Sequence, residues 1–308
     1  MGRPRELSRS VSSFAAMTPT LPPATHTNSY ALGARDVLLV EPATPYVAEQ
    51  RAWLDWARAL ASQGRRATAI VATHHHVDHI GGLDVLAREL ALHVWVHAET
   101  ATRLSVQADR LLADGDAIVL EGPIPERWEV LHTPGHAPGH VCLWNADTRV
   151  VVVGDMVASK GTILIAPGDG DMRTYLEQLD RLARLDADLA LPAHGEPIDE
   201  ATSLFRHYIA HRLMREEKVC GAVASFSSRG KPEVGRRASA TASLASSGTT
   251  IPVSSARGGT AEELLVLAYD DTPVHLWPIA ILSLRAHLEK LVLDGRVAAH
   301  EERYSLAQ

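Results

Sequence analysis

The segment of residues 73–82 reads THHHVDHIGG and directly follows an apolar, partly β-branched run at residues 67–72. Such a run is typical of a strand that is buried on both faces. Gly81 and Gly82 then let the backbone turn before the helical pattern of residues 83–90. A histidine tag would have neither the interleaved aspartate nor the preceding strand. The segment therefore predicts a strand-to-helix loop that carries potential metal ligands.

The spacing of these ligands favours two clusters. In extended backbone His74 and His76 point to the same side, because side chains repeat every two residues. Asp78 and His79 follow the point where the chain begins to turn, so they can face a neighbouring position. Imidazole and carboxylate ligands suit Zn²⁺ best, with iron and manganese as the next candidates. We expect two metal ions at this loop.

Three later strand-like runs also end in residues of the right chemistry. Residues 129–131 lead into His132 and TPGHAPGH, residues 150–153 lead into Gly154 and Asp155, and residues 187–191 lead into PAHG. The order HxHxDH, TPGHxxGH, GD and PxHG resembles the metallo-β-lactamase superfamily. This resemblance implies an α/β fold, namely an αββα sandwich.

The resemblance also implies a ligand set and a reaction. One zinc would be held by His74, His76 and His136, the second by Asp78, His79 and His194, and Asp155 would bridge them. A hydroxide between two ions is a nucleophile at neutral pH. Asp78 would orient it or take its proton, which makes Asp78 the expected catalytic residue. The expected cofactors are two Zn²⁺ per chain.

The other histidines of these motifs are expected to play supporting roles. His140 repeats the Gly-His pattern of His136 and is expected to support the ligands. His75 points away from its neighbours and is expected at the surface, and His132 is expected in the core or behind the ligands. Glu41 and Pro42 stand where many relatives have an Asp-x-Gly turn, so the carboxylate is kept and the turn changes.

Composition restricts the class of protein. Apolar residues make up 46% and charged residues 22%, which is enough to bury a core. The two cysteines argue against a disulfide scaffold, and no apolar run reaches the roughly 18 residues of a membrane span. We therefore expect a cytoplasmic enzyme with no membrane partner. The net charge of −7 and the absence of a basic stripe weigh against tight nonspecific nucleic-acid binding, although bound zinc would supply positive charge.

The chain divides into five predicted regions. Residues 1–24 are expected to be a disordered extension, with the first strand of the fold near residues 27–32. Residues 25–200 would form the metallo-β-lactamase domain and residues 201–224 a connecting helix. Residues 225–259 have no hydrophobic period and are expected to be a flexible low-complexity insertion. Two helical patterns and a terminal hairpin in residues 260–308 predict a small winged-helix domain, in which Thr260 begins the first helix.

This tail narrows the resemblance to the β-lactamase-like protein 2 family. The segments that carry it are GDMVASKGTI, YLEQLDRL, DADLALPAHGEPI, YIAHRLMREE and TAEELLVLAYDDTP. The family implies endonucleolytic cleavage of single-stranded RNA, our first hypothesis, or hydrolysis of a carrier-protein or coenzyme A acyl thioester. An iron-dependent oxidoreductase is a third hypothesis. The expected partner is one of these substrates, and a homodimer is compatible with the sequence.

Two further hypotheses belong to the RNA reaction. The leaving 3′ oxygen needs a proton or a metal ion, and His140 or His211 could deliver the proton. The winged helix could clamp a single strand through four cationic side chains, or it could pack as a lid beside the site. These side chains are Arg285, His287, Lys290 and Arg296.

Overall fold

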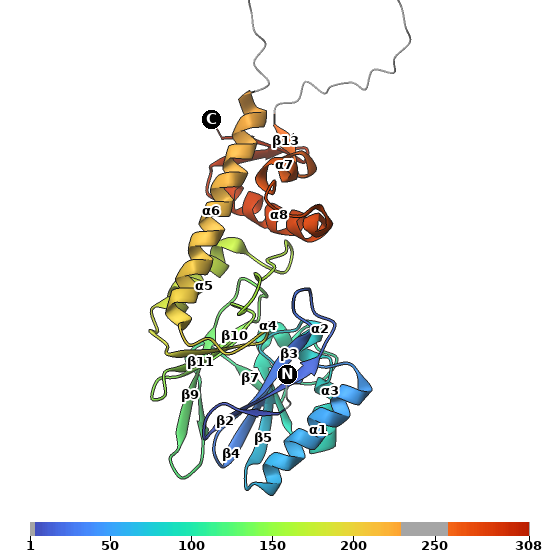
Figure 1. The fold of residues 1–308 in the computed structure, drawn as a ribbon, viewed down its shortest axis with the longest axis vertical. Coiled ribbons are helices and arrows are strands. Elements are labelled where there is room, and N and C mark those ends of the chain that lie inside the picture. Colours follow the sequence, from blue (N-terminus) through green and yellow to red (C-terminus); the bar gives the residue numbers. More distant parts are fainter. Residues whose placement is uncertain (1–3, 229–257, 308) are drawn as a thin grey trace, which may run out of the picture. The chain divides into compact units, whose positions relative to one another are not determined.

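The computed structural model describes residues 4–228 and 258–307 (Figure 1). The chain forms two compact units, Met1–His211 and Arg212–Gln308. Each unit has its own hydrophobic core.

The first unit contains a seven-stranded sheet whose spatial order follows the chain. Neighbouring strands from β1 to β4 are antiparallel, and those from β4 to β7 are parallel. The strands are β1 (Arg5–Glu6), β2 (Val11–Met17), β3 (His26–Leu32), β4 (Asp36–Val40), β5 (Arg66–Val71), β6 (His93–His97) and β7 (Arg110–Leu112).

A second sheet of five strands has the order β12-β11-β10-β9-β8. Only the β11–β12 pair within it is parallel. The strands are β8 (Ala117–Leu120), β9 (Glu126–His132), β10 (Val141–Asn145), β11 (Val150–Gly154) and β12 (Leu189–Pro192).

The two sheets pack face to face, because one buried cluster takes side chains from both. Tyr30, Leu38 and Val71 come from the first sheet, and Trp128 and Val152 from the second. Residues at alternate positions of β4 and β5 point the other way, toward the helices, as expected for strands buried on both faces.

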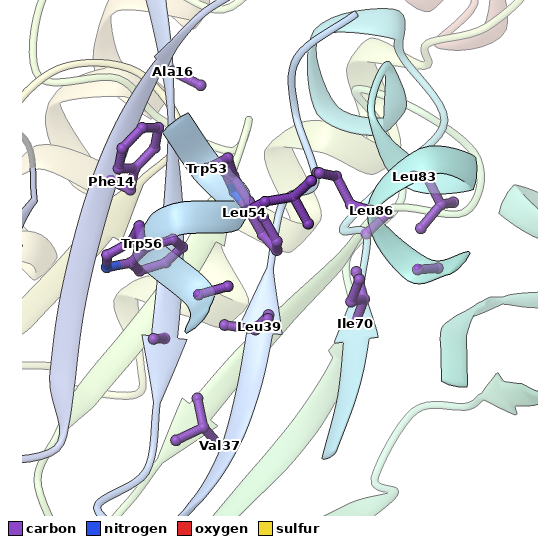
Figure 2. Packing of buried hydrophobic residues seen from close by; sticks show 14 of the residues in the cluster. Phe14, Ala16, Val37, Leu39, Trp53, Leu54, Trp56, Ile70, Leu83 and Leu86 are labelled. Carbon is purple, nitrogen blue, oxygen red and sulfur yellow. The ribbon is translucent and has the colours of Figure 1, made fainter. Parts of the chain in front are cut away.

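Helices cover the outer faces of both sheets and complete the sandwich. Trp53 and Trp56 of α1 (Val47–Ser62) and Leu86 of α3 (Leu83–Leu90) pack on the first sheet, as Figure 2 shows. On the second sheet, the Tyr175 hydroxyl of α5 (Met172–Ala183) donates to the Met156 carbonyl at 2.7 Å. Two short helices, α2 (Val77–Ile80) and α4 (Ala98–Ala101), lie in loops. The predicted αββα architecture is confirmed.

The prediction of a disordered extension at residues 1–24 was wrong where the structure forms the strands β1 and β2. All of β2 pairs with β3, from Val11 beside Leu32 to Met17 beside His26. Phe14 is buried and stacks on Trp56 with 5.5 Å between ring centroids. Ser12, one of the serines that suggested disorder, accepts a hydrogen bond at 3.2 Å from Arg65, a residue distant in the chain. Serine content alone therefore misjudged a strand whose polar groups are paired.

The second unit is built around the helix α6 (Ala201–Ser228), of which residues from Arg212 onward belong to it. Its core holds Val219, Leu264 and Leu284, and Thr260 forms a capping box with Glu263. The remaining elements are α7 (Ala261–Ala268), the 3₁₀ helix η1 (Val274–Leu276), α8 (Trp277–Leu293), β13 (Gly259–Thr260), β14 (Val297–His300) and β15 (Arg303–Leu306). Two helices followed by a β14–β15 hairpin confirm the predicted winged helix.

The predicted boundaries around the insertion need correction. Residues 225–228 continue α6, and residue 259 begins β13, so the ends of the predicted 225–259 insertion are ordered elements. The burial of Val223 and the packing of Phe226 on the core of the second unit extend the helix beyond the predicted end. The rest of the predicted insertion, residues 229–257, lies outside the described residues. Among the described residues, no helix is both long enough and apolar enough to cross a membrane.

Candidate metal centre

The expected ligands come from loops that follow strands of both sheets. The loop after β5 carries residues 74–79, Asp155 and His194 follow β11 and β12, and His136 lies between β9 and β10. The Thr73 carbonyl accepts a hydrogen bond from the Val141 backbone at 2.9 Å, which ties the first of these loops to the second sheet. The short helix α2 begins after His76, so the chain turns between the two pairs of ligands as the spacing predicted.

Three histidine nitrogens meet at the first group, which consists of His74, His76 and His136. His76 Nδ1 lies 3.0 Å from both His74 Nε2 and His136 Nε2, and the last two atoms are 3.2 Å apart. A zinc ion sits about 2.0–2.1 Å from a histidine nitrogen, which three nitrogens at these separations allow.

Hydrogen bonds to the outward ring nitrogens of His76 and His136 determine whether the inward nitrogens carry a hydrogen or a free lone pair. His76 Nε2 donates to Asp169 Oδ2 at 2.7 Å, and His136 Nδ1 donates to the Leu164 carbonyl at 2.9 Å. Both acceptors lack a proton, so the outward nitrogens carry the hydrogens and the inward nitrogens present lone pairs. Lone pairs at 3.0 Å repel each other unless a cation lies between them. The first group therefore fits a metal ion.

The second group consists of Asp78, His79 and His194. His79 Nδ1 donates to Glu41 Oε1 at 3.0 Å, and His194 Nδ1 donates to the His26 carbonyl at 3.0 Å. The Nε2 atoms of both rings face the Asp78 carboxylate, at 3.8 Å from His79 and 3.4 Å from His194. Buried His79 Nε2 has no hydrogen-bond partner, which is the condition of a ligand atom directed at an ion.

Asp155 lies between the two groups. Its Oδ1 is 3.6 Å from His79 Nε2 and 3.3 Å from His194 Nε2, while its Oδ2 is 3.5 Å from His136 Nε2. The His140 Nε2 accepts a hydrogen bond from the Asp155 backbone at 3.0 Å, and Thr133 Oγ1 lies 2.8 Å from His140 Nδ1. The structure thus puts the Asp155 carboxylate where the resemblance implied a bridge, and it puts His140 behind it.

Burial and charge give the two groups different electrostatics. Burial lowers the pKa of His74 well below its usual value, and it lowers the pKa of His136 to about 4 despite the Asp155 carboxylate. For His194 burial acts in the same direction, but Asp155 outweighs it and raises the pKa to about 10. Burial raises the pKa of Asp78, but the neighbouring His79 and His194 bring it down to about 2. The second group thus attracts a positive charge, which a proton or a metal ion can supply.

Two further histidines of the motifs, His75 and His132, lie apart from these two groups. The His132 ring stacks on His97 with centroids 3.9 Å apart, and its Nε2 lies 2.9 Å from the Pro138 carbonyl. His75 Nε2 lies 3.4 Å from Asp169 Oδ1, and the His75 side chain is 18% exposed. His75 is therefore more covered than the expected surface position.

Two carboxylates hold ligands in place: Glu41, which the sequence marked without giving it a role, and Asp169, which sequence reasoning missed. Glu41 is fully buried and accepts hydrogen bonds from His79 and from the Thr73 backbone and hydroxyl. Glu41 directly follows β4, the strand next to β5, and this position at a strand end is the feature by which the sequence could have marked it as part of the centre. Asp169 lies in the loop between β11 and α5, and no motif marks it.

Comparisons with known proteins agree with this fold and these motifs. A family model described as the metallo-beta-lactamase superfamily matches residues 22–194, and one described as the beta-lactamase associated winged helix domain matches residues 260–304. The crystal structure of a metallo-beta-lactamase family protein from Thermus thermophilus has a TM-score of 0.71 at 24% identity, covering 98% of this chain and 100% of that one. A beta-lactamase domain protein from Burkholderia ambifaria has a TM-score of 0.75 at 18% identity, covering 99% of this chain and 93% of that one. At these identities the structures show the fold alone.

Curated relatives cover shorter stretches. The Beta-lactamase-like protein 2 homolog of Caenorhabditis elegans is 29% identical over 197 residues, which are 63% of this chain and 64% of that protein. The atrochrysone carboxyl ACP thioesterase of Pseudocercospora fijiensis is 26% identical over 210 residues, which are 67% of this chain and 58% of that protein. The chain thus spans about three fifths of the length of both relatives. Because the superfamily model matches more than half of the chain, the protein belongs to the metallo-β-lactamase superfamily.

Proposed function

We propose that the protein is a metal-dependent acyl thioester hydrolase. The superfamily is one of metal-dependent hydrolases, and this level of function follows from membership. The observation that carries the proposal is a pair of exposed apolar side chains, Leu21 and Val77, which stand next in the chain to Thr20 and Asp78 at the second group of ligands.

Two groups of ligands joined by a carboxylate are suited to hydrolysis. Divalent cations bound there would acidify a water molecule and polarise the carbonyl of a substrate. The Asp155 carboxylate lies 3.5 Å from His136 Nε2 and 3.3 Å from His194 Nε2, so it would hold the two cations at a fixed separation. Asp78 remains ionised because its histidine neighbours lower its pKa to about 2, so its carboxylate can hold a cation and accept a hydrogen bond from the attacking water.

Each of these apolar residues is the direct neighbour in the chain of a residue at the centre. Val77 is 54% exposed and directly precedes Asp78. Leu21 is 49% exposed and follows Thr20, whose hydroxyl oxygen lies 3.5 Å from His194 Nε2. Binding sites combine apolar walls with a few polar groups that orient the ligand. An acyl chain can contact these side chains while its carbonyl reaches the ligands.

The leaving group also favours a thioester. A 3′ oxygen leaves with a proton or on a metal ion, and both ring nitrogens of His140, one expected proton donor, are held by Thr133 and Asp155. Burial also keeps the pKa of His140 well below its usual value, so the ring is neutral at pH 7. A thiolate departs without a proton. Similarity to the relative named as an acyl carrier protein thioesterase supports the same reaction.

Single-stranded RNA remains the competing substrate, and the predicted clamp offers it little support. Arg285 pairs with Glu262 at 3.1 Å, and Arg296 pairs with Glu217 at 2.9 Å. Lys290 lies 2.7 Å from Asp294 and 3.0 Å from Glu216. His287 is fully buried. Acidic partners thus offset the positive charge that would hold phosphates.

A side-by-side assay tests the proposal. The zinc-loaded protein is given octanoyl-coenzyme A and a short single-stranded RNA at equal concentrations. We expect hydrolysis of the thioester, with a loss of about 100-fold or more in Asp155→Asn because the shared ligand is lost. Asp188→Asn, which changes an exposed carboxylate paired with Arg149, is the matched control and should retain activity. RNA cleavage that depends on Asp155, with the thioester untouched, would refute the proposal in favour of our first hypothesis.

A further inference from the structure

We propose that Asp169 is a positioning residue for His76, and that the loop of residues 164–169 sets the tautomer of two of the three histidines in the first group. The inference rests on the proposed function, since it takes this group to be a metal site. The inference concerns Leu164 and Asp169, which no sequence motif marks. It assigns their loop, which supplies no ligand, a role in orienting the ligands.

One short loop supplies both outward acceptors. Leu164 accepts from His136 Nδ1 through its backbone carbonyl, and Asp169 accepts from His76 Nε2 through its carboxylate. Each of these contacts places a hydrogen on the outer nitrogen of a ring and leaves the inner nitrogen free of one. If either ring took the other tautomer, a hydrogen would point at the remaining nitrogens and would block a cation.

The loop is held firmly enough to do this. The Gly170 backbone donates to Ala166 at 2.7 Å, and the Asp171 backbone donates to Gly135 at 2.8 Å. The Asp171 side chain also caps α5 by accepting from the Thr174 backbone at 2.6 Å. Gly135 has φ +129°, and a Cβ there would lie 2.4 Å from the Tyr175 backbone, so the loop carrying His136 lies directly on the start of α5.

The Asp169 contact is the stronger of the two because it is charged. A carboxylate that accepts from a ligand histidine shortens the bond, orients the ring and makes its other nitrogen a better donor to a metal. Asp169 Oδ1 also lies 3.4 Å from His75 Nε2, so one carboxylate spans two neighbouring rings. The Asp169 side chain is 28% exposed, and this allows its replacement without opening a buried cavity.

The test measures metal binding and ring protonation instead of turnover. Apo-protein is titrated with Zn²⁺ against a chromophoric chelator in the wild type, Asp169→Asn and Asp169→Ala. We expect one of two binding events to weaken by about 10–100-fold in Asp169→Ala, with an intermediate effect in Asp169→Asn, which keeps an acceptor but loses the charge. Asp180→Asn, an exposed carboxylate paired with Arg184 in the same unit, is the matched control and should bind as the wild type does.

Two further readouts separate positioning from general structure. Long-range ¹H–¹⁵N spectra of the metal-free protein should show His76 with a protonated Nε2 in the wild type and mixed tautomers in Asp169→Ala, at unchanged melting temperature. Equal zinc affinity and equal tautomers in wild type and Asp169→Ala would overturn the inference while leaving the proposed function intact. A wild-type protein that binds no metal would instead overturn the proposed function itself.

Discussion

At the scale of single residues, the centre depends on hydrogen bonds behind the ligands. Glu41 is the clearest case, because a fully buried carboxylate is costly unless donors surround it. Its donors are the His79 ring and the backbone and hydroxyl of Thr73, so one side chain connects the end of β4 to the ligand loop. Glu41 has φ +60°, a conformation in which a non-glycine residue is strained, and this strain is held at the edge of the centre.

Replacing Glu41 tests this arrangement. In Glu41→Gln the carboxylate behind His79 loses its charge, and we expect the affinity of the second group for Zn²⁺ to fall by about 10–100-fold. Equilibrium dialysis with metal analysis measures the loss. Glu121→Gln, whose side chain is 57% exposed, is the control. Unchanged affinity in Glu41→Gln would show that Glu41 is not needed to hold His79.

Gly154 is a second residue with a defined steric role. It has φ +47°, and a Cβ there would lie 2.5 Å from His140 Nε2 and 2.8 Å from Thr73 Oγ1. Gly154→Ala should therefore cost about 1–3 kcal/mol beyond the strain of the backbone conformation. Gly115→Ala is the matched control, because Gly115 has φ +81° and no atoms within 4 Å of the added Cβ. Urea unfolding should show the larger loss in Gly154→Ala, and equal losses would remove the packing argument.

At the scale of elements, the segment between β2 and β3 borders the centre. It carries Thr20, whose hydroxyl oxygen lies 3.5 Å from His194 Nε2, and then the exposed Leu21, which makes this segment the proposed contact for the acyl chain. Loops held by a rigid sheet commonly carry specificity in this way. The two sheets hold the ligands in place, and we expect this segment to determine which substrates bind.

Leu21→Ser tests the proposed acyl contact. Loss of about 1–1.4 kcal/mol of apolar contact should raise the KM for octanoyl-coenzyme A about 5–10-fold and leave the KM for acetyl-coenzyme A unchanged. Ile124→Ser, which alters a side chain that is 78% exposed in the β8–β9 turn, should change neither value. An equal change for both substrates in Leu21→Ser would argue against an acyl contact at this position.

The strand β2 is an element whose contribution can be measured directly. Phe14 is buried between β2 and α1, so Phe14→Ala should destabilise the first unit by about 3–5 kcal/mol. Five of the six tryptophans lie in that unit, so tryptophan fluorescence during urea unfolding reports mainly on it. Met17→Ala, at the exposed end of the same strand, is the control and should have little effect. A small effect of Phe14→Ala would mean that β2 is dispensable.

At the scale of the whole molecule, the chain combines two units with separate cores. The second unit contains a buried ionic cluster, in which Glu216 lies 3.0 Å from Lys290 and 3.7 Å from His287. Burial would raise the pKa of Glu216, but the neighbouring His287 ring and the hydrogen bond from Lys290 outweigh burial and lower the pKa below the usual value. Breaking a buried pair of this kind leaves an uncompensated charge.

This cluster predicts how the second unit responds to acid. Since the pKa of Glu216 is lower in the folded state, its contribution to stability is present above the unfolded value, about 4.3, and is lost as the pH falls through the folded value. The ¹⁹F signal of fluorotryptophan at Trp277 follows unfolding of this unit in urea. We expect the midpoint to fall below about pH 4.5 in the wild type and to be less pH-dependent in Glu216→Gln. Glu217→Gln, an exposed neighbour, should keep the wild-type slope.

Much of the fold and of the candidate site could be predicted from local patterns. The run 67–72, the glycines that follow it and the His-Asp spacing each act over a few residues, so they could be recognised in the sequence. The N-terminal strand could not, because Ser12 and Phe14 become favourable only beside Arg65 and Trp56, which are distant in the chain. The end of α6 was missed for the same reason, since its last turns are stabilised by the core of the second unit.

The sequence by itself determined the residue types, their order and the turn that divides the ligands of the first loop into two pairs. Tertiary structure alone decided which side chains stand behind them, because Glu41 and Asp169 reach His79 and His76 across gaps of 38 and 93 residues. A local sequence pattern contains no information about contacts between residues so far apart in the chain. Hydrogen bonds to the outer ring nitrogens depend on how the sheets and loops pack, and those bonds determine which nitrogens can face a metal ion.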